Sequence, residues 1–398
     1  MPNRAYLEFY MSAVLPVYSR SDLMFEKGEG VYLFDKSGKR YLDFAAGIAV
    51  NSLGHSHPHL VAELTDQVAK LWHVSNMYQI DGLERLASRI TDACFADYIF
   101  FCNSGAEAIE CGIKMVRKYH DTTGNPDKYR IITFEGSFHG RTLAGISAAK
   151  KAKLMEGFEP AADGFDQVPF GDLDAVKRAI TPETGGILLE PILGEGGVLP
   201  ATDAFLQGLR DIADEHGLLL FFDEIQAGMG RTGKLFAHEW SGIKADIAAS
   251  AKGIGSGFPL GACLCTKAVG DTMNPGSHGS TYGNNPLGIR AGNAVMDILL
   301  EDGFLEQVNI ISKYLTSKLE ALQTEHPDLI SGVRGKGLMI GLRLTKDSRD
   351  FVEALRHEGL LTAPAADNVV RFLPPLIITK SDVDESIDII KKTISNME

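Results

Sequence analysis

The 398-residue sequence lacks any apolar run long enough to cross a membrane, and it contains no run of lysine or arginine. Its formal net charge is −13. That charge makes nucleic acid and anionic membrane surfaces unfavourable partners, so an anionic ligand needs a local binding site. The first residues lead into a mixed stretch rather than an apolar segment, and we expect no signal peptide.

Cysteine is scarce, with five residues and no C-x-x-C pair. The odd count and the apolar surroundings argue against a disulfide framework and favour reduced thiols in the cytoplasm. The H-x-H-P-H sequence at residues 55–59 comes nearest to a metal-binding pattern. Its proline interrupts the strand that alternate histidines need, and no cysteine or carboxylate cluster adjoins it. We therefore expect a turn with partly exposed histidines, and no metal.

The length predicts two domains, because single cores stop growing below this size. From about residue 80 to 290, short apolar strands alternate with helices, as in an α/β domain with a mostly parallel sheet. We expect a large domain at 46–290 and a smaller α+β domain at 291–398. Residues 1–45, which include a predicted hairpin at 31–44, are expected to pack with the small domain.

The strands of the large domain are read from short apolar runs. They are predicted at 98–102, 130–134, 186–190, 218–223, 246–250 and 262–265. Helices are predicted near 58–71, 82–94, 104–119, 172–180 and 202–216, followed by a long helical region at 286–322. Farther on, strands at 338–344 and 369–373 alternate with helices at 348–358 and 380–397.

Lys252 ends a strand of small residues and precedes a glycine-rich turn at 253–257. So much bare backbone leaves room for a large ligand close to the main chain. One fixed role for such an amine is a Schiff base with the aldehyde of pyridoxal phosphate. Taken alone, a solvated lysine at a turn is the commoner interpretation, because most lysines are exposed.

Two other predicted strands end in polar residues. Ser104 begins a helix with the capping pattern S-x-x-E, and Gly105 and Ala106 follow, so free N–H groups and a positive dipole end suit a phosphate. Asp223 ends the buried strand at the edge where α/β sheets bind ligands, and Gln226 lies three residues on. Simple capping and an ordinary turn are the alternatives, although an unpaired buried carboxylate is costly.

Four further stretches carry candidate binding residues. Phe138 is suited to stack on a flat ring, and Arg141 offers a planar fork for a carboxylate. Arg371 lies inside an apolar strand and needs a partner, for which Glu195 or a substrate carboxylate is a candidate. The polar turn around Ser280 and Thr281 offers hydroxyl groups. Residues 228–234 fit G-x-x-x-x-G-K, but a leucine follows where a nucleotide-binding loop requires Ser or Thr, so we reject nucleotide hydrolysis.

In this order the motifs resemble those of the class III (ω-amino-acid) aminotransferases, pyridoxal-phosphate enzymes of fold type I. The resemblance extends from residues 41–47 to 371–375, and its most specific parts are 103–107, 223–226 and 251–253. It implies a homodimer with shared active sites. It also implies pyridoxal 5′-phosphate as the cofactor, and an amino donor and 2-oxoglutarate as the substrates.

The resemblance further implies a role for each candidate residue. The catalytic residues are Lys252, which would bind the cofactor and move a proton, and Asp223, which would pair with the pyridinium nitrogen. The remaining cofactor contacts are Ser104, Gly105, Ala106, Phe138, Gln226 and, reaching the neighbouring subunit, Thr281. The substrate contacts are Arg141, Glu195, Ser280 and Arg371. Glu195 is implied to neutralise Arg371 while the ω-amine donor is bound, and to release it for 2-oxoglutarate.

The donor is predicted from a narrower likeness. Residues 46–55 and 71–76 favour N2-acetyl-L-ornithine, which would give N-acetyl-L-glutamate 5-semialdehyde and L-glutamate in arginine biosynthesis. Relatives that grip a free α-amine carry tyrosine about where Ile48 falls, and an apolar Ile48 fits an acylated amine. 4-Aminobutyrate, ornithine and succinyl-diaminopimelate remain alternative donors. A decarboxylase, a mutase and a binding-only protein are rivals as well, although Lys252 and Asp223 disfavour the last.

Overall fold

The computed structural model describes residues 13–397, so the first twelve residues of the predicted N-terminal segment lie outside the described part. A central sheet of seven strands has the order β4-β12-β11-β10-β7-β5-β6. Its strands are β4 (Tyr98–Cys102), β5 (Arg130–Phe134), β6 (Phe165–Val168), β7 (Thr184–Leu189), β10 (Leu219–Asp223), β11 (Ile247–Ser250) and β12 (Gly261–Cys265). Only the pairs made by β12 are antiparallel, so the predicted mostly parallel α/β sheet is confirmed.

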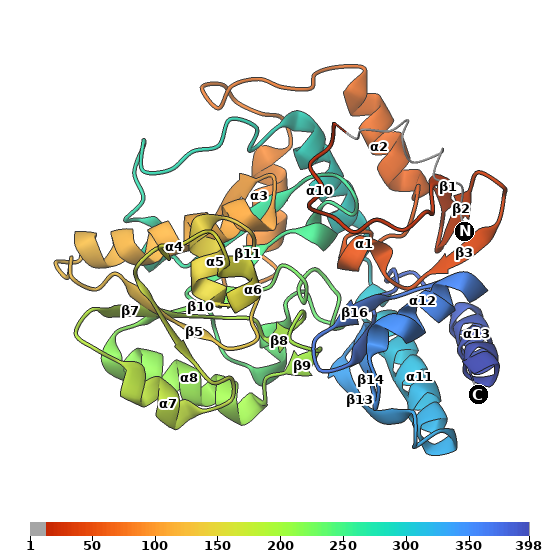
Figure 1. Ribbon diagram of the computed structural model, residues 1–398. Coiled ribbons are helices and arrows are strands. Elements are labelled where there is room, and N and C mark those ends of the chain that lie inside the picture. The colour runs from red at the N-terminus through yellow and green to blue at the C-terminus, as the bar shows by residue number, and fades with distance from the viewer. Residues whose placement is uncertain (1–12, 398) are drawn as a thin grey trace.

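Helices cover both faces of this sheet (Figure 1). Helix α4 (Gly105–Thr122) lies on one face, and α7 (Leu173–Ala179) and α8 (Asp203–His216) lie on the other. Successive residues of β10 point to opposite faces. Phe221 therefore packs into the core under α4, and Phe222 into the core under α8. A continuously apolar strand is what burial on both faces requires.

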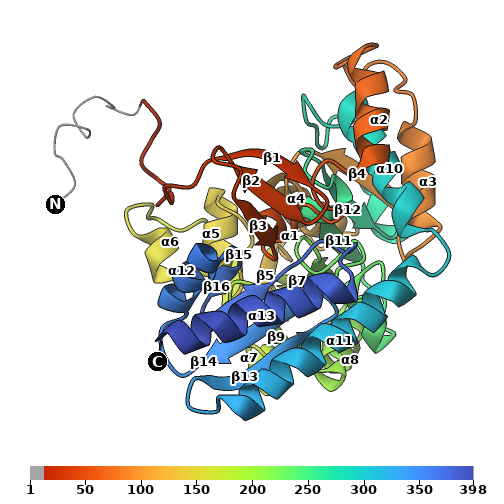
Figure 2. The same cartoon turned by 90° about the vertical axis from the view of Figure 1, so that its right-hand side faces the viewer.

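The first described strands pack with the C-terminal part of the chain (Figure 2). Strands β1 (Phe25–Glu29), β2 (Tyr32–Asp35) and β3 (Arg40–Asp43) form a sheet completed by β15 (Leu360–Leu361), which runs parallel to β3. A second small sheet has the order β13-β14-β17-β16. Its strands are β13 (Ile330–Lys336), β14 (Met339–Leu344), β16 (Ala363–Ala365) and β17 (Val369–Phe372). Helices α12 (Ser348–Glu358) and α13 (Lys380–Met397) pack beside them.

The predicted helical region at 286–322 consists of two helices, α10 (Pro286–Leu299) and α11 (Phe304–Glu325). Gly303, with φ 84°, turns the chain between them. Strands β6 and β13 are absent from the prediction. Their apolar residues are few, and pairing with neighbouring strands decides their conformation.

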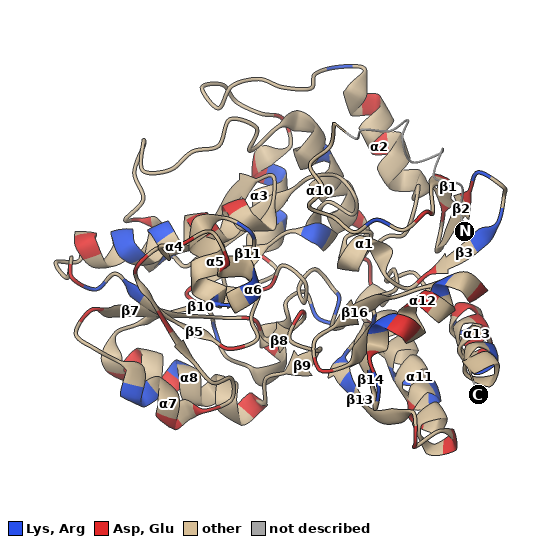
Figure 3. Ribbon diagram, viewed as in Figure 1, with Lys and Arg blue, Asp and Glu red and all other residues tan. Residues whose placement is uncertain are grey.

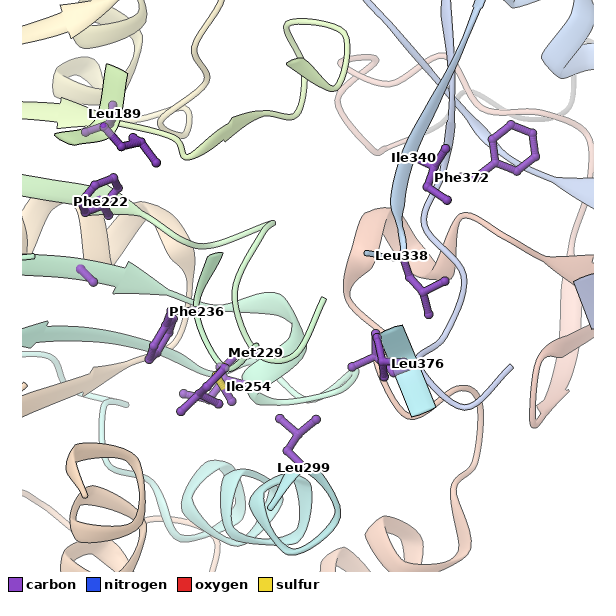
Figure 4. Close-up of a cluster of buried hydrophobic side chains, with 14 of the residues drawn as sticks. Leu189, Phe222, Met229, Phe236, Ile254, Leu299, Leu338, Ile340, Phe372 and Leu376 are labelled. Atoms are coloured by element: carbon purple, nitrogen blue, oxygen red, sulfur yellow. The ribbon is translucent and has the colours of Figure 1, made fainter. Parts of the chain in front are cut away.

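One hydrophobic core joins the central sheet to the C-terminal sheet. It includes Phe222 and Phe236 on one side and Leu338, Ile340 and Leu376 on the other (Figure 4). This continuity fixes the edge of the central sheet relative to β17. Acidic and basic residues are interspersed along the outer helices (Figure 3). Within residues 13–397, no helix is both long and apolar enough to cross a membrane.

Candidate active site

The carboxyl ends of β4, β7, β10 and β11 meet at one edge of the central sheet, beside a cavity of about 380 Å³. Ligand sites of open α/β sheets lie at this edge. The structure brings most of the predicted site residues together around this cavity: Ser104, Gly105, Ala106, Phe138, Glu195, Asp223, Gln226 and Lys252. They come from segments up to 148 positions apart in the chain, from Ser104 to Lys252.

Lys252 lies two residues beyond the end of β11 and has the left-handed backbone angle φ 50°. A non-glycine residue in this region costs about 1–2 kcal/mol, and such strain gathers at functional sites. Burial lowers the pKa of the Lys252 amine to about 8, and the nearby Arg371 acts in the same direction against the carboxylates of Asp223, Glu195 and Glu190. A lowered pKa supplies more neutral amine, which is the nucleophilic form.

Asp223 is buried, and each of its two carboxylate oxygens has a hydrogen-bonding partner. Oδ2 lies 2.8 Å from Nδ1 of the buried His139, and Oδ1 accepts the N–H of Ile225 at 3.1 Å. The His139 ring therefore fixes the direction of the carboxylate. The sequence showed His139 beside Phe138, but neither spacing nor pattern pointed to its pairing with Asp223.

The N-terminus of α4 faces the cavity, as predicted. Ser104 caps the helix, and its Oγ accepts the N–H of Glu107 at 3.3 Å. The Glu107 carboxylate reaches back to the N–H of Asn103 at 2.9 Å, one residue before the position expected for a capping box. Gly105 is required here, because a Cβ would lie 2.7 Å from the Ile225 side chain. The backbone N–H groups of the first turn suit a phosphate.

Arg371 and Glu195 form an ion pair, with Nη1 2.7 Å from Oε1. The guanidinium is buried, and it also donates to Gln226 Oε1 at 3.3 Å and to the carbonyl of Pro364 at 3.1 Å. The Glu195 side chain is 34% exposed and that of Arg371 only 2%, so solvent reaches the carboxylate partner but not the guanidinium. This geometry is compatible with exchange of Glu195 for a substrate carboxylate.

Glu190 lines the cavity; the sequence marked it as an acid at a strand end, but no role was predicted for it. It accepts the N–H groups of Phe138 at 2.8 Å and of Gly194 at 3.0 Å, and so joins the loop of the predicted stacking ring to the loop of Glu195. Burial, followed by the charge of Asp223, raises the pKa of Glu190 to about 7. The signal that could have identified Glu190 as a site residue is its position directly after β7, at the edge of the sheet where ligands bind.

Four predicted residues lie outside the cavity lining: Arg371, which contacts the lining residues Glu195 and Gln226, and Arg141, Ser280 and Thr281. Arg141 is exposed, and its guanidinium carbon lies 5.8 Å from the centre of the Phe138 ring. Ser280 bonds Asn103 and Glu107 at the start of α4, at 3.1 and 3.2 Å, and Thr281 is exposed. Lys234, from the rejected nucleotide-binding pattern, donates to the carbonyl of Glu239 at 3.0 Å. No group of three metal-binding side chains occurs in the described part of the chain.

The sequence matches known proteins over nearly its whole length. The family model "Aminotransferase class-III" matches residues 16–394. The acetylornithine aminotransferase of Mesorhizobium japonicum is 55% identical over 380 residues, which cover 96% of this chain and 95% of the relative.

Solved structures share the fold. N-acetylornithine aminotransferase from Stenotrophomonas maltophilia K279a superposes with a TM-score of 0.83 at 38% identity, over 95% of this chain and 97% of that one. An ornithine aminotransferase from Toxoplasma gondii, described with partial occupancy of PLP at its active site, has a TM-score of 0.90 at 28% identity, over 96% and 92%. The overall shape is thus common to acetylornithine and ornithine aminotransferases.

Proposed function

The chain belongs to the class-III aminotransferases, and from this membership we propose that it moves the ω-amine of N2-acetyl-L-ornithine to 2-oxoglutarate. The products are N-acetyl-L-glutamate 5-semialdehyde and L-glutamate, in a step of arginine biosynthesis. The choice of N2-acetyl-L-ornithine as the donor rests on the 55% identity to an acetylornithine aminotransferase across nearly the full chain. The ornithine aminotransferase of similar shape is only 28% identical.

The cavity residues fit pyridoxal phosphate, on which class-III aminotransferases depend. Lys252 would attach the cofactor, Asp223 would face its ring nitrogen, and the α4 N-terminus with Ser104, Gly105 and Ala106 would hold its phosphate. The bound cofactor supplies an electron sink for the carbon that loses a proton. The buried His139 keeps the Asp223 carboxylate aimed into the cavity.

The protein residues orient the substrates and move the proton. The Lys252 amine, with its lowered pKa, is suited to take a proton from the substrate carbon and to return it. Glu195 neutralises Arg371 while the donor is bound. When 2-oxoglutarate enters, Arg371 takes the α-carboxylate and the exposed Arg141 takes the distal one. One pocket then serves two substrates in turn.

The assembly and the cellular setting complete the proposal. A homodimer would bring Thr281 and Ser280 to the partner's cofactor phosphate and substrate; the exposure of Thr281 in a single chain supports this. Five free cysteines support a reducing cytoplasm. The division into domains at 46–290 and 291–398, with the earlier residues joined to the second, accords with the pairing of β3 and β15.

A donor panel tests the function. Purified protein is given 2-oxoglutarate and, at equal concentrations, N2-acetyl-L-ornithine, L-ornithine, 4-aminobutyrate or succinyl-diaminopimelate, and L-glutamate formation is measured. We expect the highest kcat/KM with N2-acetyl-L-ornithine. A higher value with 4-aminobutyrate would overturn the proposed donor but leave the aminotransferase.

A further inference from the structure

Four consecutive residues of α1 (Ala46–Ala49) form a left-handed turn, with φ values of 46°, 65°, 63° and 62°. Three of them are not glycine, and Ile48 is β-branched, which makes its positive φ a genuine outlier. The Ile48 side chain is 40% exposed, so core packing offsets little of this strain. Strain of this kind persists only where surrounding contacts enforce it, and it gathers at functional sites.

Asp43 and His55 provide those contacts. Oδ1 of the buried Asp43 accepts the N–H groups of Ala45 at 2.9 Å and Ala46 at 2.8 Å, at the entry to the turn. Oδ2 lies 2.8 Å from Nε2 of His55. The His55 backbone pairs with Gly30, and Gly28 packs so closely against His55 that a Cβ there would lie 2.6 Å from the His55 Cβ.

The residues on either side of this turn contact two parts of the active site, the loop after Lys252 and the strand of Arg371. Val50 lines the cavity with Lys252. Ser52 Oγ donates to the carbonyl of Gly253 at 3.0 Å, and the N–H of Leu53 donates to Ser256 Oγ at 2.9 Å, both in the turn after Lys252. At the other end, Phe44 accepts the N–H of Leu373 at 2.7 Å, just beyond the strand that carries Arg371.

We propose that Asp43 and His55 are positioning residues that set donor selectivity by holding the 46–50 segment, whose Val50 forms a rigid apolar side of the cavity. This inference rests on the proposed function. It gives a role to the first histidine of the H-x-H-P-H sequence, which the sequence pattern alone assigned to a partly exposed turn. Neither residue touches the reacting atoms, so both act through Val50.

The selectivity has a physical cause. A free α-ammonium group of L-ornithine loses water against the apolar side chain of Val50 without gaining a partner, whereas the acylated amine of N2-acetyl-L-ornithine carries no charge. If the 46–50 segment relaxes, water enters and the penalty on the charged donor falls. The same relaxation misplaces the acylated donor, and small misplacements of a substrate slow the reaction markedly.

The test compares two amides at position 55. In His55→Gln the side-chain nitrogen reaches about as far as Nε2 and keeps the bond to Asp43, whereas His55→Asn is too short to make it. His59→Asn is the matched control, because His59 Nε2 also lies 2.8 Å from an aspartate oxygen, of Asp297. Gly47→Ala is a second way to disturb the turn: its φ of 65° disfavours alanine, while the added Cβ comes no closer than 3.4 Å to Asn51.

The readout is the ratio of kcat/KM for N2-acetyl-L-ornithine to that for L-ornithine. We expect His55→Asn and Gly47→Ala to lower this ratio roughly tenfold, with His55→Gln and His59→Asn close to wild type. An equal loss of kcat/KM with both donors in His55→Asn would overturn the inference. If His55→Asn does not fold, an unchanged ratio in Gly47→Ala would overturn it. Either result leaves the proposed function standing. A wild-type preference for L-ornithine would overturn both.

Discussion

The floor and the wall of the cavity hold their charged groups in different ways. The floor, defined as Lys252, Asp223 and His139, is fixed: both Asp223 oxygens are bonded, and the histidine beside it is buried. The wall, defined as Glu195, which lines the cavity, together with Arg371 and Arg141 just outside the lining, keeps one buried guanidinium but pairs it with a carboxylate that is 34% exposed. The third member, Arg141, is exposed.

This difference separates two tasks. A preorganised, water-excluded floor suits chemistry that both half-reactions share, because fixed charges need no rearrangement when the reaction occurs. A wall with an exchangeable partner suits a pocket that must accept first a donor and then a keto acid. Changes to the floor should therefore slow both half-reactions together, and changes to the wall should alter their ratio.

Lys252→Ala removes the floor's nucleophile and is expected to have the largest effect. We expect kcat to fall by more than about 10³-fold, because covalent attachment and proton transfer are lost together. The fold should remain, which circular dichroism and a melting curve check. Wild-type turnover by this variant would refute the account of the floor.

Asp223→Asn keeps the shape of the floor and removes its negative charge. Loss of one preorganised charge from a buried site typically costs on the order of 10²–10³ in kcat. We expect that loss, together with weaker binding of pyridoxal phosphate in equilibrium dialysis. An unchanged cofactor affinity and a kcat within threefold of wild type would show that the charge does not act on the cofactor.

Lys252→Met tests how much the buried charge of Lys252 lowers the free energy of unfolding of the cofactor-free protein. The folded-state pKa of Lys252 is about 8, below the ordinary value of 10.5. Below pH 8 the amine is charged in both the folded and the unfolded protein, and burying this charge destabilises the folded state. Above about pH 10.5 the amine is neutral in both states, and this penalty is absent. Removing it should stabilise the protein at pH 7 by about 1–3 kcal/mol.

The pH series distinguishes this cause from a packing effect. In urea unfolding, the gain from Lys252→Met should shrink as the pH rises from 8 to 10.5. The exposed Lys177→Met serves as the control and should show no such trend. A gain that stays constant from pH 7 to 10.5 would assign it to packing rather than to titration.

Glu195→Gln changes the wall and is expected to have the smallest effect. Arg371 would then stay charged and unneutralised while the donor is bound, so we expect the donor half-reaction to slow roughly tenfold. The half-reaction with 2-oxoglutarate should be unchanged or slightly faster. Glu325→Gln, which breaks a surface pair with Lys391 of 3.1 Å, is the control.

The sequence predicted the sheet and most of the floor, because these depend on short-range patterns. Apolar runs marked β4, β10 and β11. Asp223 is the last residue of β10, and Ser104 and Lys252 lie two residues beyond the ends of β4 and β11. Strand ends of a parallel sheet converge at one edge, so residues far apart in sequence were predicted to meet.

Contacts that depend on the tertiary arrangement could not be predicted from the sequence. The bond from His139 to Asp223 and the bridge made by Glu190 join loops on different strands, and no periodicity encodes them. The left-handed turn at 46–49 contains only one glycine, so local preference argued against it. Asp43 and His55, twelve positions apart, stabilise it instead.

The ratio of the two half-reaction rates tests the division between floor and wall most directly. It is measured by stopped-flow absorbance of the bound cofactor, with N2-acetyl-L-ornithine in one experiment and 2-oxoglutarate in the other. We predict that Asp223→Asn lowers both rates and leaves their ratio within about threefold of wild type, whereas Glu195→Gln shifts the ratio roughly tenfold. A shifted ratio in Asp223→Asn with an unshifted one in Glu195→Gln would contradict the account.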